Sequence, residues 1–348
     1  MDSLLCGYLR NNKRDVLTFV VDTEATTAGG KVTSAPIDCY KTGGVFRTNI
    51  YISWGDGTST IVPSGSSDLS LLEHEYASAG VYAVNITAEN MKDVFFVGSN
   101  PNDGVHTIPH TQYFRETLIS IGPLGAERYS LPFMQINPYS FFIECRHLRR
   151  IPEGLFDKWT HCVGFDNAFN GCTSITEVPE DLFKYNTEVL TFENCFSNIP
   201  NLKSVPENLF SANTKATNFS YLFYYSTGLS VVPVNLFREN KEALTFAGTF
   251  CGCTGLSSIP EAVFSSNTKA ESFYGTFKEC ANLTTVPENL FASNNAVTDF
   301  SFAFYVCTGI TGNVPELWAT HSETEQHTDV FYGCTNAANY VDIPADWK

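Results

Sequence analysis

Hydrophobic positions in the second part of the chain recur with a fixed period of 27 residues. Phe stands at one register position eight times without exception, at residues 142, 169, 196, 223, 250, 277, 304 and 331. Pro follows the same period six times, at residues 152, 179, 206, 233, 260 and 287. A fixed period in this range is typical of a solenoid, in which each repeat is one coil that buries its apolar side against neighbouring coils. We therefore expect a repeat solenoid over residues 141–348.

The repeating unit, F-x-x-x-F-x-x-C-x-x-L-x-x-V-P-E-x-L-F-x-x-N, predicts the structure of one coil. L-x-x-V is expected to be a short strand that pairs with its copies in adjacent coils, about 4.8 Å away. Pro-Glu-x-Leu-Phe predicts a short helix, because Pro tolerates the first helical position and Glu favours the positive end of the helix dipole. The two Phe are expected on one helical face that points to the core. Asn is expected to end the helix in the left-handed conformation, at residues 186, 213, 240, 267 and 294.

The ends of such a stack need caps, because a single coil cannot bury its own apolar side. We expect a right-handed solenoid of about seven to eight coils. Residues 341–348 repeat the V-P-E-x-L-F pattern in degenerate form and are expected to cap the last coil. Residues 118–121, with the Pro-rich run up to Pro138, are expected to cap the first coil.

Six of the eleven Cys belong to the repeat, at residues 145, 172, 253, 280, 307 and 334. A thiol between a Phe and a Leu of the repeat is expected in the core, where free Cys behaves as a small hydrophobic side chain. Disulfides between adjacent coils remain an alternative. The ligand-like spacings are Cys251-Gly-Cys253 and His106…His110, which do not amount to a zinc site. The Glu column after the Pro could hold calcium, but its place at a helix start explains it. We expect no metal and no cofactor.

Residues 15–97 have a different pattern. Apolar and polar residues alternate in runs such as Val81–Thr87, and clusters of Gly, Ser and Thr separate the runs. This pattern predicts a small β-sandwich. Trp54 is expected as a core aromatic at the end of a strand, and residues 55–57 (Gly-Asp-Gly) as a tight turn that needs positive φ.

Two parts of the chain each resemble a known protein family. The segment Gly248–Pro260 (GTFCGCTGLSSIP) resembles the BspA-like leucine-rich repeats of bacterial and protist surface proteins, and this resemblance covers about residues 118–348. BspA-like units usually run a few residues shorter and carry an extra Ile-Gly segment. Residues 51–57 (YISWGDG), with His74-Glu-Tyr76 and Gly80-Val-Tyr82, resemble the polycystic-kidney-disease (PKD) domain, although one Phe of its pattern is missing. The resemblances imply an immunoglobulin-like spacer or docking domain, a structural role for His74, and a chain that is exposed on a surface.

Charge and motifs narrow the function classes. The net charge is −16, about −5 before residue 140 and −11 after it. Lys and Arg never share a repeat position in two adjacent coils, so we expect no nucleic-acid binding. The chain has no P-loop, no G-x-G-x-x-G, no G-x-S-x-G and no H-E-x-x-H, and its carboxylates sit at repeat positions. We therefore expect a non-enzymatic protein for recognition, adhesion or display, with a glycan-processing enzyme as a remote alternative.

We expect no signal peptide in residues 1–14, and no transmembrane span or membrane insertion. Two locations are consistent with surface domains that lack a leader. The first is the surface of a phage virion, as a head or tail decoration or host-adhesion component. The second is a bacterial cell surface, or secretion as an adhesin, with a leader absent from this chain. The expected partners are a protein or glycan on a cell surface, or neighbouring virion proteins.

The domain organisation that follows is an N-terminal segment at 1–14, a PKD-like β-sandwich at 15–97, a linker and N-terminal cap at 98–140, and the leucine-rich-repeat solenoid at 141–348. The candidate binding residues are the polar positions between Leu and Val of the repeat, which vary from coil to coil. We call this set the hydroxyl face; it consists of Arg149, Arg150, Thr176, Glu177, Lys203, Ser204, Ser230, Ser257, Ser258, Thr284 and Thr285.

Overall fold

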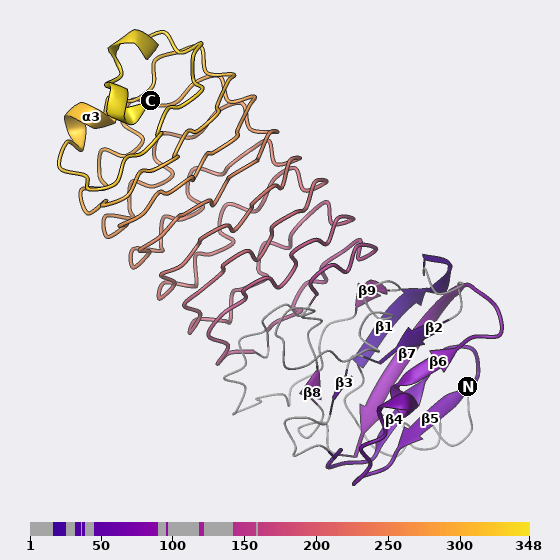
Figure 1. Cartoon of the computed structure of the whole chain (residues 1–348). Helices are drawn as coiled ribbons and strands as arrows, with labels where there is room; N and C mark the ends of the chain where they lie inside the picture. The colour runs from indigo at the N-terminus through magenta and orange to yellow at the C-terminus, as the bar shows by residue number, and fades with distance from the viewer. Residues whose placement is uncertain are drawn as a thin grey trace.

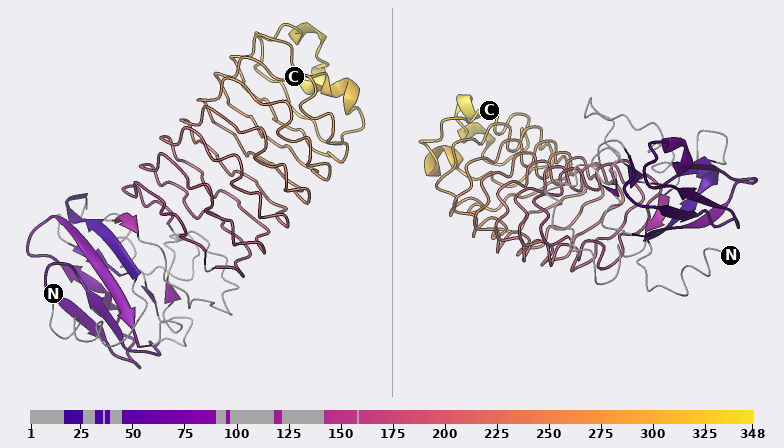
Figure 2. Two further views of the ribbon diagram at one scale, coloured as in Figure 1. Left: turned by 180° about the vertical axis from the view of Figure 1, so that it is seen from behind. Right: turned by 90° about the horizontal axis from the view of Figure 1, so that it is seen from below.

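The protein has two regions, a β-sheet region and a stack of coils that runs along one axis from it to the C-terminus (Figures 1 and 2). The computed structural model describes residues 17–25, 32–35, 37–38, 45–89, 95–96, 118–121, 142–157 and 159–348. The predicted N-terminal segment 1–14, most of the predicted linker and cap at 98–140, and His106 and His110 lie outside the described residues.

The first region is built on a five-stranded antiparallel sheet with the order β5-β4-β7-β1-β9. Its strands are β1 (Leu17–Asp22), β4 (Ile50–Ser53), β5 (Ser59–Val62), β7 (Val81–Ala88) and β9 (Leu118–Ile121). Two smaller antiparallel pairs are β2 (Val32–Ser34) with β6 (Glu73–Glu75), and β3 (Ile37–Asp38) with β8 (Phe95–Phe96). Two short 3₁₀ helices are η1 (Thr23–Ala25) and η3 (Leu69–Leu72). The alternating pattern therefore forms antiparallel strands, as predicted.

Alternation also sets which side of the sheet is buried. Ile52 pairs with Ile86 across β4 and β7, and both side chains are fully buried. Trp54, directly after β4, is fully buried, and Gly55 and Gly57 have φ of 88° and 94°. The core aromatic and the positive-φ turn expected from the sequence are thus confirmed.

The segment at 118–121 corrects an expectation. It was expected to cap the first coil, but it forms β9, the edge strand that pairs with β1 in the register Phe19↔Ile121 and Val21↔Leu118. The physical reason is that β1 has β7 on one side only, so its other edge is open to a further strand.

The second region packs Phe rings in continuous columns through the coils. The ring centroids of Phe250 and Phe277 lie 5.5 Å apart in one column, and those of Phe237 and Phe264 lie 6.0 Å apart in another. These rings are fully buried. Each buried Phe contributes about 1.5–3 kcal/mol, so adjacent coils stabilise one another through the columns. The solenoid predicted from the 27-residue period is confirmed in this form.

The F-x-x-x-F segment is not helical, in contrast to the prediction. Alternate amides donate across to the next coil: Phe250 N–H to the carbonyl of Thr276 at 2.9 Å and Gly252 N–H to that of Lys278 at 2.7 Å. Residues between them close turns within the coil, as Cys253 N–H does to the carbonyl of Phe250 at 3.1 Å. Both rings still face the core, but through a series of turns that are hydrogen-bonded between coils.

Parallel pairing between coils is also displaced from its predicted place. Isolated parallel bridges join the residue before the first Phe of successive coils, from Gly164↔Thr191 to Asp299↔Gln326. Within residues 142–157 and 159–348, the L-x-x-V segments form no strands. Some adjacent coils are joined there by a single amide, such as Thr284 N–H to the carbonyl of Ser257 at 3.0 Å.

The predicted helices reduce to turns in all but one place. After Pro233, for example, Leu236 N–H donates to the Pro carbonyl at 3.2 Å, which is an i to i+3 turn. In the described coils an α-helix forms only at α3 (Leu317–Thr320), where His321 N–H reaches the carbonyl of Leu317 at 2.8 Å. The chain must reverse within a short segment to complete each coil, which leaves no room for a longer helix.

The Asn after each turn has another role than the predicted left-handed cap. None of the five has positive φ. Their buried amides donate to the preceding coil, as Asn240 Nδ2 does to the carbonyls of Phe210 at 3.0 Å and Asn213 at 2.9 Å. The same pair of bonds recurs at each Asn of this ladder, at residues 186, 213, 240, 267 and 294.

The Cys ladder and the C-terminal cap agree with the sequence. All six repeat cysteines are fully buried free thiols. Most donate to a Phe carbonyl of the preceding coil, as Cys253 does to Phe223 at 3.1 Å. The last coil is covered by η5 (Tyr340–Asp342) and η6 (Ala345–Trp347), where Phe331 N–H donates to the carbonyl of Trp347 at 2.9 Å.

Candidate functional surfaces

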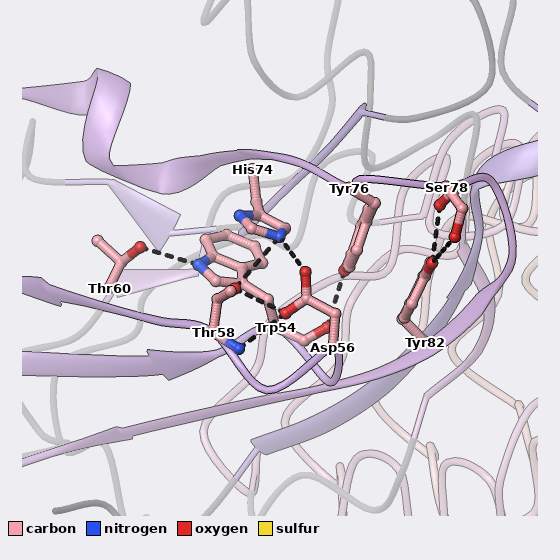
Figure 3. A network of polar contacts seen from close by, with 8 residues as sticks. All are labelled: Trp54, Asp56, Thr58, Thr60, His74, Tyr76, Ser78 and Tyr82. Atoms are coloured by element: carbon pink, nitrogen blue, oxygen red, sulfur yellow. Dashed lines mark hydrogen bonds and ion pairs between the residues drawn. The ribbon is translucent and has the colours of Figure 1, made fainter. Parts of the chain in front are cut away.

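The residues of the W-G-D-G…H-x-Y pattern come together beside the end of β4 (Figure 3). The Trp54 ring stacks on His74 with centroids 4.9 Å apart. His74 Nε2 lies 2.8 Å from a carboxylate oxygen of Asp56, and Thr58 donates its hydroxyl to the other oxygen at 2.6 Å. Tyr76 donates its hydroxyl to the carbonyl of Trp54 at 2.9 Å. The turn at 55–57 and the pairing of β6 with β2 place these side chains.

The chemistry of this cluster is that of a brace for the turn. Burial would raise the pKa of Asp56, but hydrogen bonds from Thr58 and His74 outweigh burial and lower it to about 2. The His74 nitrogen that approaches the Thr58 hydroxyl, at 3.4 Å, is the one already bonded to Asp56. A nucleophile–base relay needs the two ring nitrogens to face different partners. The geometry therefore fits the structural role that the PKD resemblance implies for His74.

The hydroxyl face is exposed at every one of its residues, in two adjacent columns along the coils. Some of its hydroxyls bond to the preceding coil; Thr284 Oγ1 donates to the carbonyl of Ser257 at 3.0 Å, and Ser230 Oγ to that of Lys203 at 3.3 Å. These hydroxyls are partly used for coil-to-coil contact. A hollow of about 240 Å³ near the C-terminal end is lined by Thr285, Glu288 and Asn339, among others. The binding role of this face stays a prediction.

A second surface was not singled out from the sequence. It lies over the paired-Phe segments, where the residues between and after the two Phe face solvent. We call it the tyrosine strip, and it consists of Tyr221, Tyr224, Tyr225, Tyr274, Lys278, Glu279, Phe302, Tyr305 and Tyr332. Tyr225 is 38% exposed, Tyr274 37% and Tyr332 50%, whereas the other members are partly buried.

Direct contacts connect members of the strip within a coil and between adjacent coils. Tyr224 packs edge to face on Tyr225 with centroids 4.6 Å apart. Lys278 Nζ lies 5.2 Å from the ring centroid of Tyr305, within the range of a cation–π contact. Tyr305 stacks in turn on Tyr332 at 5.1 Å. The strip is therefore a continuous surface rather than a set of isolated rings.

Tyr225 shows how the strip is held in place. Its ring lies on Gly252, since a Cβ at that position would be 2.9 Å from Cγ of the ring. Gly252 has φ of 70°, which glycine adopts without strain. The Tyr225 hydroxyl donates to the carboxylate of Glu279, two coils further on. This hydrogen bond, together with burial and the nearby negative charge, raises the pKa of Tyr225 above its ordinary value. The ring is thus fixed on one side and open on the other.

Three rings of the strip occupy a backbone conformation that disfavours them. Tyr221, Tyr225 and Phe302 have φ of 56°, 51° and 61°. The equivalent positions of other coils carry Gly, as at Gly248 and Gly275, or Asn, Asp, Glu and, at Val306, a β-branched side chain. The left-handed conformation costs a bulky residue about 1–2 kcal/mol. Residues kept at such a cost are more frequent at functional sites. This observation therefore supports the strip as a candidate functional surface.

The described residues contain no group of three or more His, Cys, Asp or Glu side chains placed to hold a metal ion. Burial raises the pKa of Cys251 to about 12, so the thiol beside the strip stays protonated at neutral pH. No helix in the described ranges is long and apolar enough to cross a membrane.

The sequence held a signal for the strip. Aligned by the period, the positions after each Phe are mainly Asp, Asn or Glu in the coils that begin at residues 165 and 192. From residue 219 onwards Tyr or Phe stands at one or more of these positions in each coil except the one with Gly248 and Gly252. The appearance of aromatic side chains at these register positions was visible in the sequence. The outward orientation of these side chains was not visible in the sequence, because it depends on the left-handed turns.

No protein-family model and no curated protein matches this chain. Among solved structures, part of the chain is similar to part of a chain in the structure of the Toll–Spatzle complex, described as a molecular hub in Drosophila development and innate immunity. The sequence identity is 18%, and the match covers 48% of this chain and 28% of that chain, with a TM-score of 0.24. This chain thus spans less than a third of that protein's length. The match is distant, and the solenoid assignment rests on the coils themselves.

Proposed function

We propose that this chain is a non-enzymatic recognition or display protein that binds its partner through the exposed sides of its coils. The observation that carries the proposal is a fixed core under a variable surface. Phe, Cys and Asn repeat from coil to coil in the core, whereas the hydroxyl face and the tyrosine strip change from coil to coil. A regular stack with an extended, varied surface is the usual basis of recognition in repeat proteins.

The finer assignments belong to the same proposal. The repeat pattern supports a BspA-like leucine-rich-repeat solenoid, and the cluster of Trp54, Asp56, His74 and Tyr76 supports a PKD-type, immunoglobulin-like sandwich. Both families are found mainly on exposed surfaces. We place the chain on a phage virion, as a decoration or host-adhesion component, with a bacterial cell surface or secretion as an adhesin as the alternative. Imaging of the native source with an antibody to this chain distinguishes the two.

The test of the proposal is binding of the purified full-length chain to intact cells or particles from its source. The quadruple variant R149A/R150A/E177A/K203A removes the charges of the hydroxyl face, and the triple variant Y225A/Y305A/Y332A removes three rings of the strip. Loss of binding in either variant assigns recognition to the coils. Binding that survives in both variants but is lost with H74A would place recognition on the sheet region. Turnover of a polysaccharide that one carboxylate change abolishes would show an enzyme instead.

A further inference from the structure

We propose that the tyrosine strip is a binding site for a linear, uncharged glycan chain that lies along the axis of the solenoid. The proposal rests on the proposed function, because it names the ligand class and the place of recognition. Its starting point is that the strip carries the largest group of exposed aromatic rings in the described coils, joined by direct contacts.

The first argument is the presentation of the rings. Tyr225 rests with one side on Gly252 and is 38% exposed. The face of an aromatic ring carries negative potential, which attracts the polarised C–H groups on the flat side of a sugar ring. The hydrogen bond to Glu279 holds the Tyr225 ring before any ligand arrives. A ring that is already fixed loses little conformational entropy on binding.

The second argument is the shape of the surface. The strip extends along the coils from Tyr221 to Tyr332, with an aromatic or hydrogen-bonding side chain in each coil except the one with Gly248 and Gly252, and the ring centroids of Tyr305 and Tyr332 lie 5.1 Å apart. An extended sugar chain advances by a similar step at each residue, so successive sugars would meet successive coils. A stable protein–protein interface needs about 20–30 residues on each side. Nine residues in a strip fit a single polymer chain better than a globular protein.

The third argument is charge. The positively charged group of the strip, Lys278, lies 3.7 Å from the carboxylate of Glu279 and over the rings of Phe302 and Tyr305. Its charge is therefore compensated within the strip. The whole chain carries a net charge of −16, and such a field repels acidic polymers. Uronate-containing or sulfated glycans are disfavoured, and a neutral glycan is not.

The fourth argument is the backbone. Tyr221, Tyr225 and Phe302 hold the left-handed conformation, which Gly, Asn, Asp, Glu and Val hold at the equivalent positions of other coils. Packing within the coils does not require a ring there, because Gly248 and Gly252 occupy the same two positions in the next coil. A use for the rings outside the fold explains why they are retained.

The experiment measures binding of the full-length chain to soluble polysaccharides by affinity electrophoresis and titration calorimetry. The neutral probes are β-glucan, xylan, mannan and starch-type α-glucan, and the acidic probes are polygalacturonate and heparin. We expect binding to at least one neutral probe and none to the acidic ones. Y225A/Y305A/Y332A should weaken that binding by about tenfold or more. The matched control Y185A removes an exposed ring that belongs to neither the strip nor the hydroxyl face, and it should change binding by no more than about twofold.

Two further single variants serve as controls in case the triple variant misfolds. Y332A alone removes the most exposed ring, and G252A displaces the Tyr225 ring; both should weaken binding while the far-ultraviolet spectrum stays that of the parent chain. Binding to no neutral probe would overturn the glycan assignment, as would tighter binding to heparin or polygalacturonate. Undiminished binding by the triple variant would overturn the location. Loss of a protein partner with the triple variant, without any glycan binding, would overturn this inference and leave the proposed recognition role in place.

Discussion

The two regions of this protein are stabilised in different ways. In the sheet region Trp54 has His74 as its stacking partner, and Tyr76 stacks on Tyr82 with centroids 3.8 Å apart. Each of these buried contacts occurs once and is not repeated along the chain. In the coils one contact recurs, such as the Phe column with its step of 27 residues. A change in the sheet therefore removes a unique interaction. A change in a coil removes one member of a series, and its effect should depend on how many neighbours that coil has.

The largest expected effect tests this dependence on neighbours. Phe250→Ala should destabilise the coils by about 3–5 kcal/mol, because the ring is fully buried between Phe223 and Phe277 and the void cannot collapse. Phe331→Ala should have a smaller effect, since a coil covers that ring on one side and the C-terminal cap on the other. Urea unfolding followed by circular dichroism measures both. Equal losses of stability would contradict the linear arrangement.

The Asn ladder gives the next largest effect. Asn240→Ala removes the donor of two hydrogen bonds and leaves the carbonyls of Phe210 and Asn213 buried without it. We expect a loss of about 2–3 kcal/mol in the free energy of unfolding. The matched control is Asn235→Ala, whose amide donates to the exposed carboxylate of Glu207 and should contribute less than about 1 kcal/mol. Similar losses for the two variants would show that the ladder bonds are not important for stability.

The two regions should also respond to pH with opposite sign. The pKa of Asp56 is lowered to about 2, so its contribution to the sheet is present above about pH 4 and is lost as the pH falls towards 2. Burial raises the pKa of Asp166 in the coils to about 6, although Thr191 and the Glu193 amide oppose this. The folded coils then bind more protons than the unfolded chain between about pH 4 and 6, so their stability falls as the pH rises through this range.

Asp166→Asn keeps the acceptor oxygen and removes the buried charge. It should raise the stability of the coils at neutral pH by on the order of 1–3 kcal/mol and flatten their pH dependence between 4 and 6. Asp56→Asn should instead lower the stability of the sheet at neutral pH. Hydrogen exchange of peptides from each region, measured from about pH 2 to pH 7, separates the two effects, because the Asp56 contribution changes between about pH 2 and 4 and the Asp166 contribution between about pH 4 and 6. A pH dependence of the same sign in both regions would contradict the assignment.

The contrast between the regions also explains how much was predictable. Periodicity identified the core of the coils, because a residue such as Phe250 meets the same surroundings in each repeat. Alternation identified the strands of the sheet, and the short motif around Trp54 and His74 identified a cluster that does form. These are features in which side-chain chemistry and spacing determine the contact.

Backbone conformation was less predictable. Pro-Glu-x-Leu-Phe has every local feature of a helix start, yet its copies in the described coils form turns, because the chain turns into the next coil. The helix α3 (Leu317–Thr320) begins within the divergent sequence Pro-Glu-Leu-Trp. The spacing of the two Phe suited a helix, but alternate amides bond to the adjacent coil instead. The tyrosine strip was missed for the same reason, since residues such as Tyr225 face outwards only through left-handed turns. Contacts between coils decide these conformations, and one coil's sequence does not display them.

The most direct test of the account is whether energetic coupling in the coils is confined to neighbours. Phe250→Leu and Phe277→Leu change two rings that stack at 5.5 Å, whereas Phe196→Leu and Phe304→Leu change rings of the same column in distant coils. Double-mutant cycles from urea unfolding measure the coupling energy of each pair. We predict a coupling of about 0.5–3 kcal/mol for the adjacent pair and additivity within about 0.5 kcal/mol for the distant pair. Coupling of equal size in both pairs would contradict a stack held together by nearest-neighbour contacts.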